Sequence, residues 1–343
     1  MLARARIIVS GLVQGVGFRP FCYREAQKQG LHGFVRNAGD GGVEIMVEGE
    51  RDAIKRFLNV LKQNPPPLAE IDTVRVEWDR PSGEFKDFKV IKSEKTGVGA
   101  APIVPADIHI CEACLHEMHN PRDRRYLYPF TTCVNCGPRF TIIEALPYDR
   151  ERTSMREFPL CNECRTEYAD PNNRRYHAEP TCCPNCGPKV VLLNTEGRPI
   201  ETSHSFAEVA KMLDDGQIGL IKGIGGMHIA CKTSEDQPLQ RLREILRRPQ
   251  QPFALMSSSI EKIKTFAELS DQEIALLRSP RKPIVVLCQK SDSPISDLVA
   301  PKLHTVAVML PYSGVHHLIL EEGKEPAYVM TSANMPGLSL IHI

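Results

Sequence analysis

The sequence predicts a multidomain protein in which an α+β domain, a cysteine-rich module and an α/β domain follow one another. Strand and helix patterns alternate over residues 4–91, an internal repeat fills residues 107–190, and a second strand and helix alternation begins near residue 200. A chain of 343 residues is too long for one comfortable core and long enough for two or three domains. We expect domains at 1–92, 107–190 (repeat units 107–156 and 157–190) and 200–337, with a linker at 93–106.

The charge balance excludes a strong electrostatic preference for nucleic acid or an anionic membrane. The chain has 43 basic and 42 acidic side chains and a net charge of +1, so any anion site must be local. No apolar stretch approaches the roughly 18 residues of a membrane helix, and the first apolar run is too short for a signal peptide. We therefore expect a cytoplasmic protein without membrane or nucleic-acid partners, in which disulfides do not explain the twelve cysteines.

The first domain has the pattern of a ferredoxin-like fold. Two segments with helical spacing, 21–30 and 50–63, lie between segments in which apolar and polar residues alternate as in strands. The turn NAGDGG between two of these strands is a strong hairpin signal. The order is β-α-β-β-α-β with a short additional strand, which is the split βαβ arrangement. The expected strands are 7–13, 32–38, 42–50, 72–78 and 85–91.

The internal repeat carries two metal sites. CEACLHEMHNPRDRRY…CVNCGP recurs as CNECRTEYADPNNRRY…CPNCGP, with matching residues 50 positions apart. Each unit holds two Cys-x2-Cys turns, which supply the four thiolates that a closed, structural zinc site requires. Pairing within each unit is the simpler arrangement, and exchange of ligands between units stays open. The expected ligands are Cys111, Cys114, Cys133 and Cys136, then Cys161, Cys164, Cys183 and Cys186.

A glycine-rich loop after the first strand predicts a phosphate site. In LVQGVGFRPF the glycines allow N–H groups to converge on an anion, and a helix N-terminus follows near Pro20. Arg19 adds a planar fork that suits phosphate oxygens, although a tight turn with a surface arginine would show the same pattern. The loop candidates are Gln14, Gly15, Val16, Gly17 and Phe18.

Residues 4–91 resemble the acylphosphatase family. The likeness is carried by G-x-V-Q-G-V-G-F-R and by the asparagine 18 residues after the arginine, within GFVRNAGDGGVEI. The resemblance implies that the loop and Arg19 bind phosphate and that Asn37 orients the attacking water. Such a site is chemically sound, because phosphoryl transfer depends on positioning and charge stabilisation.

The whole chain resembles the N-terminal part of the HypF family of hydrogenase maturation carbamoyltransferases. NPRDRRYLYPFTTCVNCGPRFT and DPNNRRYHAEPTCCPNCGP carry this likeness, and GLIKGIGGMHIAC, RRPQQPFALM, LPYSGVHHLIL and MTSANMPG resemble the family's YrdC-like α/β domain. The resemblance implies that carbamoyl phosphate is hydrolysed and that carbamate is then joined to AMP from ATP, with Mg2+. It also implies two structural zinc ions, and carbamoyl transfer to a HypE-type acceptor protein by a further C-terminal domain. The implied nucleotide-site residues are Arg248, Thr331, Ser332 and Asn334.

The chain departs from the family pattern in this last domain. Ile245, Leu246 and Gln251 stand where basic residues are expected, and Lys232 stands where an aspartate is expected. Two lysines near a triphosphate are thereby lost, so the sequence leaves the adenylation activity open. We also expect residues 338–343, LSLIHI, to be a non-native tail, and the carbamoyl-transfer domain to be missing from this chain.

Two alternative functions remain at this stage. The chain could be an acylphosphatase in which the zinc and YrdC-like parts are only a scaffold. It could also be an RNA-binding module, because zinc ribbons bind RNA and arginines cluster in both repeat units. Neutral net charge and a context rich in proline and asparagine favour arginines that stabilise turns. These arginines are Arg122, Arg124, Arg125, Arg139, Arg174 and Arg175.

Overall fold

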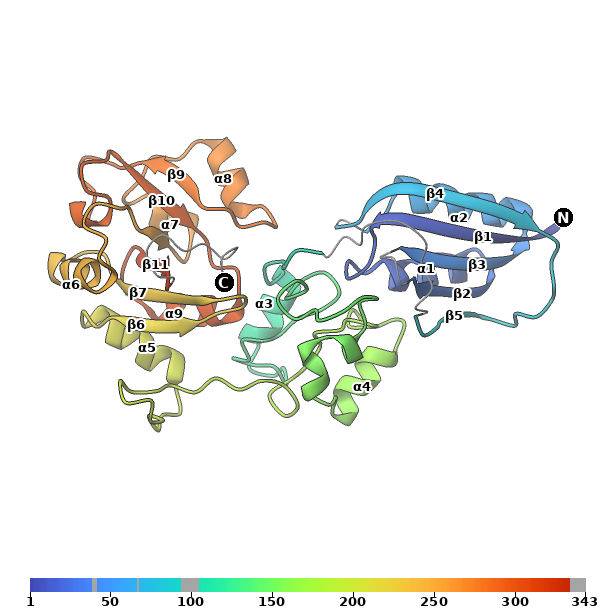
Figure 1. Cartoon of the computed structure of the whole chain (residues 1–343), viewed down its shortest axis with the longest axis horizontal. Coiled ribbons are helices and arrows are strands. Elements are labelled where there is room, and N and C mark those ends of the chain that lie inside the picture. Colours follow the sequence, from blue (N-terminus) through green and yellow to red (C-terminus); the bar gives the residue numbers. More distant parts are fainter. Residues whose placement is uncertain (39–41, 67, 94–104, 334–343) are drawn as a thin grey trace. The chain divides into compact units, whose positions relative to one another are not determined.

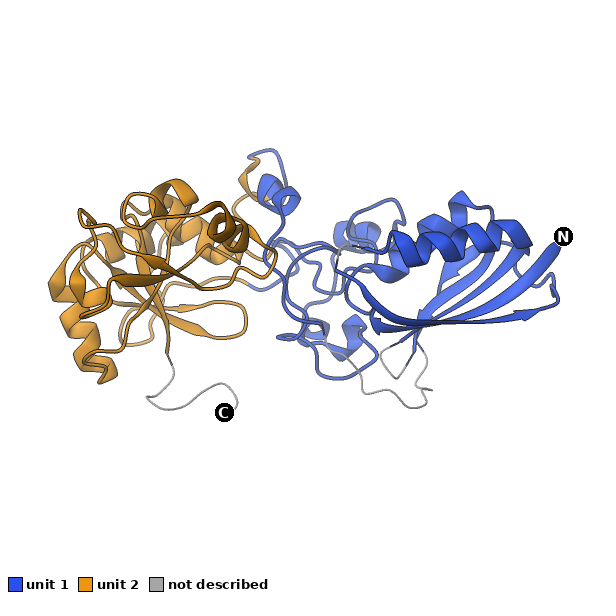
Figure 2. Cartoon of the chain, turned by 90° about the horizontal axis from the view of Figure 1, so that it is seen from above, with its two compact units in different colours: residues 1–117, 121–125, 131–188 blue, residues 118–120, 126–130, 189–343 orange. Residues whose placement is uncertain are grey.

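The computed structural model describes residues 1–38, 42–66, 68–93 and 105–333 (Figure 1). Most of the expected linker, Asn334 and the expected tail at 338–343 lie outside the described residues. The chain divides into two compact units, 1–117 with 121–125 and 131–188, and 118–120 with 126–130 and 189–343 (Figure 2). Among the helices of the described part, none has the length and apolar character that crossing a membrane requires.

The N-terminal domain has the predicted ferredoxin-like order. Its sheet runs β4-β1-β3-β2-β5, with β2 and β5 parallel and the other pairs antiparallel (Figure 1). Alternate residues of the first strand, such as Ala5, Ile7 and Val9, are fully buried, which explains why this segment forms a one-sided strand. The elements are β1 (Leu2–Leu12), α1 (Phe18–Lys28), β2 (His32–Asn37), β3 (Val43–Glu50), α2 (Arg51–Gln63), β4 (Glu70–Asp79) and β5 (Phe88–Val90).

The repeat region contains little regular structure. Each unit has one short helix that begins directly after the first cysteine of the unit, because that cysteine ends an extended segment and the next turn presents the second cysteine. Loops and turns make up most of the remainder, as metal-stabilised modules allow. The elements are α3 (Glu112–His119), α4 (Asn162–Ala169) and two 3-10 turns, η1 (Arg150–Arg152) and η2 (Ser154–Glu157).

The C-terminal domain is built on a mixed sheet ordered β6-β7-β11-β8-β10-β9, in which only β8 and β10 pair in parallel among the described strands. The elements are α5 (Ser205–Asp214), β6 (Gly219–Lys222), β7 (Met227–Lys232), α6 (Asp236–Leu246), β8 (Ala254–Met256), α7 (Ile260–Ile263), α8 (Asp271–Arg278), β9 (Val285–Cys288), η3 (Asp297–Val299), β10 (Thr305–Met309), α9 (Gly314–Glu322) and β11 (Tyr328–Ser332). The predicted combination of helices and strands is confirmed, but the mixed, mostly antiparallel sheet makes the domain α+β in class.

The apolar runs IGLIKGIGG (218–226), PIVVLCQ (283–289) and AYVMTSA (327–333) predict only three of these six strands, β6, β9 and β11. The segment expected at 218–226 ends as a strand at Lys222, because the glycines that follow form a turn in which the Gly223 N–H donates to the Gly226 carbonyl. The strands β7, β8 and β10 were missed, since they are short or directly follow a turn.

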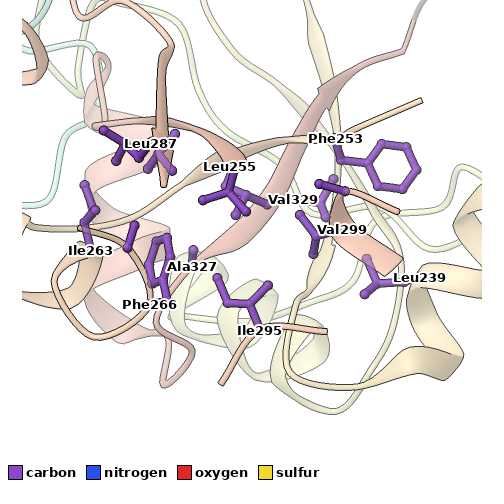
Figure 3. Close-up of a cluster of buried hydrophobic side chains, with 14 of the residues drawn as sticks. Leu239, Phe253, Leu255, Ile263, Phe266, Leu287, Ile295, Val299, Ala327 and Val329 are labelled. Atoms are coloured by element: carbon purple, nitrogen blue, oxygen red, sulfur yellow. The ribbon is translucent and has the colours of Figure 1, made fainter. Parts of the chain in front are cut away.

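The main core of this domain lies between its sheet and helices. Figure 3 shows Leu239 from α6, Leu255 from β8 and Val329 from β11 within one cluster of buried side chains. Phe253 and Phe266 fill the same cluster and are fully buried. A close-packed core of this kind holds the end of β11, where the candidates Thr331 and Ser332 lie, in a fixed position.

Candidate phosphate site and zinc centres

The glycine loop has the conformation that its sequence demands. It links β1 to α1, and Gly15 and Gly17 adopt left-handed φ angles of 69° and 77°. A Cβ on Gly15 would stand 2.8 Å from the Cγ of Pro105, so a larger residue there meets both strain and a clash. Gly17 is the N-cap of α1, and Phe18 and Arg19 form its first turn. The loop therefore aims a helix N-terminus and a fixed arginine at one region.

The Gln14 side chain fastens this loop to two other segments. Its Nε2 atom donates to the carbonyl oxygens of Ala38 and Gly42, at 2.9 and 2.8 Å. Its Oε1 atom accepts from the backbone N–H of Tyr148 at 3.0 Å. Gln14 is buried, and these contacts hold the glycine loop against both segments. Direct contact between Gln14 and phosphate stays a prediction.

Arg19 is a buried cation with two carboxylate partners. Its Nη1 lies 2.9 Å from Asp149 Oδ1, and its Nη2 lies 2.8 Å from Glu179 Oε1 and 3.3 Å from the Tyr148 carbonyl oxygen. Burial disfavours the charged guanidinium, but the nearby Glu179 and Asp149 charges outweigh it and raise the pKa of Arg19. The alternative interpretation of this pattern, a tight turn with an arginine on the surface, is therefore wrong.

Asn37 meets Arg19 at a shared acceptor. Its Nδ2 donates to the Tyr148 carbonyl oxygen at 3.0 Å, the same oxygen that accepts from Arg19. Asn37 is fully buried, and its Oδ1 has no hydrogen-bond partner among the described residues. A buried acceptor without a donor is costly unless water or a ligand supplies one. The structure therefore brings together the two residues that the sequence proposed as catalytic.

Residues of the repeat region form the other wall of this pocket. A small pocket is lined on one side by the glycine loop and on the other by Arg139, Tyr148 and His177. Arg139 Nε donates to the Gly15 carbonyl at 2.8 Å. Burial and the Arg19 charge lower the pKa of His177 to about 3, so it is neutral at pH 7. The Tyr148 hydroxyl is buried without a described hydrogen-bond partner.

Sequence analysis missed these wall residues, although the chain offered one weak signal. The second repeat unit reads RRYHAEP where the first reads RRYLYPF, so a histidine and a glutamate replace apolar residues in an otherwise duplicated turn. Glu179 of this turn is almost fully buried and also accepts from the Tyr168 hydroxyl at 2.7 Å and the Arg150 N–H at 2.9 Å. Burial outweighs these contacts and raises the pKa of Glu179 above its ordinary value.

The eight predicted cysteines form two clusters, each within one repeat unit. In the first, the Cys111 and Cys133 sulfurs are 3.8 Å apart, and the Cys114 and Cys136 sulfurs are 3.4 Å apart. A tetrahedral site with zinc to sulfur bonds of about 2.3 Å requires sulfurs about 3.8 Å apart. The donor set therefore fits Zn2+. The second cluster has the same arrangement and consists of Cys161, Cys164, Cys183 and Cys186.

Each unit supplies an arginine to the cysteines of the other. Arg174 Nη2 of the second unit lies 3.1 Å from Cys114 Sγ of the first, and Arg124 Nη2 of the first lies 3.2 Å from Cys164 Sγ of the second. A zinc ion with four thiolates carries a net charge of −2, which these guanidinium groups offset.

The neighbouring arginines complete this reciprocal bracing. Arg175 donates to the Thr132 carbonyl at 3.0 Å, and Arg125 donates to the Cys182 carbonyl at 2.9 Å, a pair of contacts related by the repeat. Both arginines are buried and pair with glutamates on the short helices. Side chains used in this way are not available as an RNA-binding surface, which removes the main support for that alternative.

The nucleotide-site candidates lie at the end of β11. Arg248 and Thr331 are both largely buried, and Arg248 Nη1 donates to Thr331 Oγ1 at 3.2 Å. Ser332 ends β11 opposite His228 of β7 and is exposed. The structure thus brings three of the four candidates to one region, while Asn334 lies outside the described residues.

The residues that depart from the family pattern lie in three different environments. Ile245 is 57% exposed on α6, whereas Leu246 is buried in the core. Lys232 is nearly buried, and its Nζ lies 2.6 Å from Glu235 Oε1 and 2.9 Å from the Asp214 carbonyl. Its charge is therefore committed within the domain and does not replace the expected lysines.

A further arginine, missed in the sequence, supports the loop that carries Arg248. Arg243 is buried, donates to the carbonyls of Arg248 and Gln251 at 2.7 and 3.1 Å, and stacks on Phe253. Helical spacing places Arg243 two turns into α6, but nothing in that pattern shows that it points inward.

Comparisons with known families follow the same division of the chain. Residues 5–90 match the acylphosphatase family, and residues 110–143 and 160–193 match the HypF finger family. Residues 211–342 match the Sua5/YciO/YrdC family, which is described as telomere recombination. The acylphosphatase of Thermococcus kodakarensis is 44% identical over 88 residues, which are 94% of its length and 26% of this chain.

Full-length relatives match nearly the whole chain. A probable carbamoyltransferase HypF of Methanocaldococcus jannaschii is 52% identical over 340 residues, which cover 98% of this chain and 44% of that protein. The crystal structure of full-length HypF in its phosphate- and nucleotide-bound form matches with a TM-score of 0.90 at 42% identity, covering 98% of this chain and 43% of that one. The crystal structure of T. kodakarensis HypF matches with a TM-score of 0.89 at 47% identity over the same shares. This chain, which spans less than half the length of these relatives, belongs to the HypF carbamoyltransferase family.

Proposed function

We propose that the N-terminal domain hydrolyses carbamoyl phosphate to carbamate and phosphate. Arg19 and the loop from Gln14 to Phe18 bind the phosphoryl group, and Asn37 orients the attacking water. The observation that carries this proposal is the convergence of Arg19 and Asn37 on one oxygen, beside a glycine loop at a helix N-terminus. The likeness to acylphosphatases over 94% of a relative supports the same reaction class.

The proposed mechanism needs no strong nucleophile. Water donates a hydrogen bond to the buried Oδ1 of Asn37, which lacks a described partner, and attacks phosphorus in line with the leaving carbamate. Arg19 and the loop amides stabilise the charge on the phosphoryl oxygens as the bond to carbamate breaks. The neutral His177 adds no charge to the pocket.

We further propose that the C-terminal domain joins carbamate to AMP, so that carbamate and ATP give carbamoyl adenylate and pyrophosphate. Arg248, Thr331, Ser332 and Asn334 would contact the nucleotide, with Mg2+ on the phosphates. A related HypF was crystallised in a nucleotide-bound form, which supports this assignment. Transfer of the carbamoyl group to a HypE-type acceptor in the cytoplasm would need the part of the relatives that this chain does not span.

The two zinc ions would have a structural role in this protein. Each cluster offers four thiolates, which fill a tetrahedral zinc site and leave no position for a substrate. Cys133 of the first cluster also lines the pocket, so zinc would hold a wall of the pocket in place. The domain boundaries that we propose remain 1–92, 107–190 and 200–337.

The first test is phosphate release from carbamoyl phosphate by the zinc-loaded chain. We expect release by the wild type, and a loss of at least about 100-fold in Arg19→Ala and in Asn37→Ala, the scale expected for removing a charge-stabilising donor. Zinc content measured on the same samples separates loss of the site from loss of the fold. Wild-type protein that carries two zinc ions and releases no phosphate would contradict the proposal.

The second test is pyrophosphate release from ATP in the presence of carbamoyl phosphate. Release that depends on Arg248 would support adenylation. The absence of the expected lysines, at positions now held by Leu246 and Gln251, favours a second candidate function, an acylphosphatase whose C-terminal domain is a scaffold. Phosphate release without any pyrophosphate release would establish that candidate in place of adenylation.

A further inference from the structure

The side chains of Arg19 and Asn37 donate hydrogen bonds to one segment of the repeat region, residues 147–149, here called the closing segment. The Tyr148 carbonyl oxygen accepts from Arg19 and from Asn37 Nδ2, and the Asp149 carboxylate accepts from Arg19 Nη1. A carbonyl oxygen and a carboxylate thus occupy the guanidinium that, by the proposed function, binds the phosphoryl oxygens.

Most N–H groups on the two Nη atoms of Arg19 already have hydrogen-bond acceptors. Its two Nη atoms have four N–H groups, and the structure assigns three of them to Asp149, Glu179 and the Tyr148 carbonyl. A phosphate that binds Arg19 through two parallel hydrogen bonds must therefore replace at least one of these partners.

The two carboxylates also weaken the attraction of this pocket for an anion. Arg19 and Arg139, which both line the pocket, carry +2, and Asp149 and Glu179 carry −2 together, so these four groups sum to zero. Release of the Asp149 carboxylate leaves a net charge of +1 beside the phosphate. Because both arginines are buried, solvent screens these charges only weakly.

The two carboxylates differ in how easily they can leave. The Glu179 side chain has 0% exposure and is held by the Tyr168 hydroxyl and the Arg150 N–H as well as by Arg19. The Asp149 side chain is 28% exposed, and Asp149 is the N-cap residue of the 3-10 turn η1. Asp149 is thus the partner that an entering anion can displace, while Glu179 keeps Arg19 oriented.

We propose that the closing segment is a built-in competitor for the acyl phosphate, in which Asp149 occupies Arg19 until the substrate phosphoryl group displaces it. Substrate entry then moves the Tyr148 carbonyl away from Arg19 Nη2, so that both Nη atoms can donate to the phosphoryl oxygens. Gln14, which binds the Tyr148 N–H, links the glycine loop to this movement. The inference rests on the proposed phosphate site and adds a specificity element from the repeat region: only an anion that binds Arg19 better than Asp149 opens the site.

The test measures the affinity of the full, zinc-loaded chain for inorganic phosphate by isothermal titration calorimetry. Removing the competing charge in Asp149→Asn should tighten phosphate binding by about tenfold or more, since even about 1.4 kcal/mol of relieved repulsion gives that factor. Glu151→Gln is the matched control, because it removes an exposed carboxylate two residues beyond Asp149, outside the closing segment. We expect its affinity to equal that of the wild type.

The outcomes separate this inference from the proposed function. Tighter binding in Asp149→Asn, lost when Arg19→Ala is added, supports the displaceable carboxylate. Wild-type binding that neither Asp149→Asn nor Asp149→Ala tightens overturns the displaceable carboxylate and leaves the proposed phosphate site standing. Absence of binding in the wild type and in Asp149→Asn, both with two zinc ions, overturns the phosphate site and the inference together. Asp149→Ala repeats the measurement without a hydrogen-bonding side chain, so that an amide contact to Arg19 cannot mask the effect.

Discussion

The two repeat units make the same turn and use it for different purposes. Leu127 and His177 occupy equivalent positions with left-handed φ angles of 54° and 50°, and each donates its N–H to the carbonyl of the residue nine positions earlier. In the first unit, the turn belongs to the compact unit that contains the C-terminal domain, whereas in the second it belongs to the unit that contains the phosphate loop.

Side-chain chemistry after the turn explains the difference. In the first unit, Phe130 packs against a buried apolar cluster, and the Pro129 carbonyl lies so close to Gly314 that a Cβ there would come within 2.3 Å of it. In the second unit, the position of Pro129 is taken by Glu179, which binds Arg19. The two repeat units thus share one backbone turn, and a few different side chains after it make the two turns contact different domains.

The largest effect should follow from removing the scaffold that both turns share. Cys164→Ser deprives the second cluster of a ligand, and zinc binding by small modules contributes about 10–16 kcal/mol of folding free energy. We expect one zinc ion per chain and a large fall in Tm. Cys182→Thr is the matched control, because Cys182 is no cluster member and the first unit has Thr132 there. Two zinc ions in Cys164→Ser, or one in Cys182→Thr, would contradict the assignment.

The next effect tests the second turn by itself. Glu179→Ala leaves Arg19 buried without its fully buried partner, which should reduce the free energy of unfolding by about 3 kcal/mol. Urea unfolding followed by the fluorescence of Trp78, the single tryptophan, reports on the sheet of the N-terminal domain. Glu179→Gln keeps the hydrogen-bond acceptor and should lose less. Equal stability of Glu179→Ala and wild type would show that this turn does not support the phosphate loop.

The first turn should give a smaller effect, confined to the other domain. Phe130→Ala removes a half-buried ring, so we expect a loss of about 2 kcal/mol in the C-terminal domain, with unchanged phosphate binding. Hydrogen exchange measured over α9 and β11 locates the change. Phe140→Ala, at a ring that is 67% exposed in the same module, is the control and should leave exchange unaltered. A loss of phosphate binding in Phe130→Ala would contradict the proposal that the first turn supports only the C-terminal domain.

The smallest effect lies outside both turns and depends on pH. Burial opposes ionisation of Glu44, but hydrogen bonds from Arg6 and Arg36 outweigh it and lower the pKa of Glu44 below its ordinary value of 4.5. This carboxylate stabilises the sheet above pH 4.5, and the contribution is lost as the pH falls through its lower folded-state pKa. Glu44→Gln should therefore be less stable than wild type by about 1 kcal/mol at pH 6, with a smaller difference at pH 4. A difference that grows on acidification, measured by Trp78 fluorescence, would contradict this sign.

Local patterns predicted the N-terminal domain and the metal ligands well, because both depend on short spacings. Alternation in β1 and the Cys-x2-Cys turns are visible within a few residues. The candidate site was only half predicted, since Tyr148, Asp149 and Glu179 reach Arg19 from more than 125 residues away in sequence. No periodicity records such contacts. The strands β8 and β10 were missed for the opposite reason, because their few residues carry too little pattern.

The reciprocal bracing of the repeat units has a consequence for synthesis of the chain. The first cluster has all its ligands once Cys136 is made, yet the arginine that covers its sulfurs is Arg174. On the ribosome, this first zinc centre therefore emerges with its thiolates open to oxidants and to competing metals. Its protection arrives only with the second unit, so a pause in translation between the two would be the moment at which the nascent protein is most easily damaged.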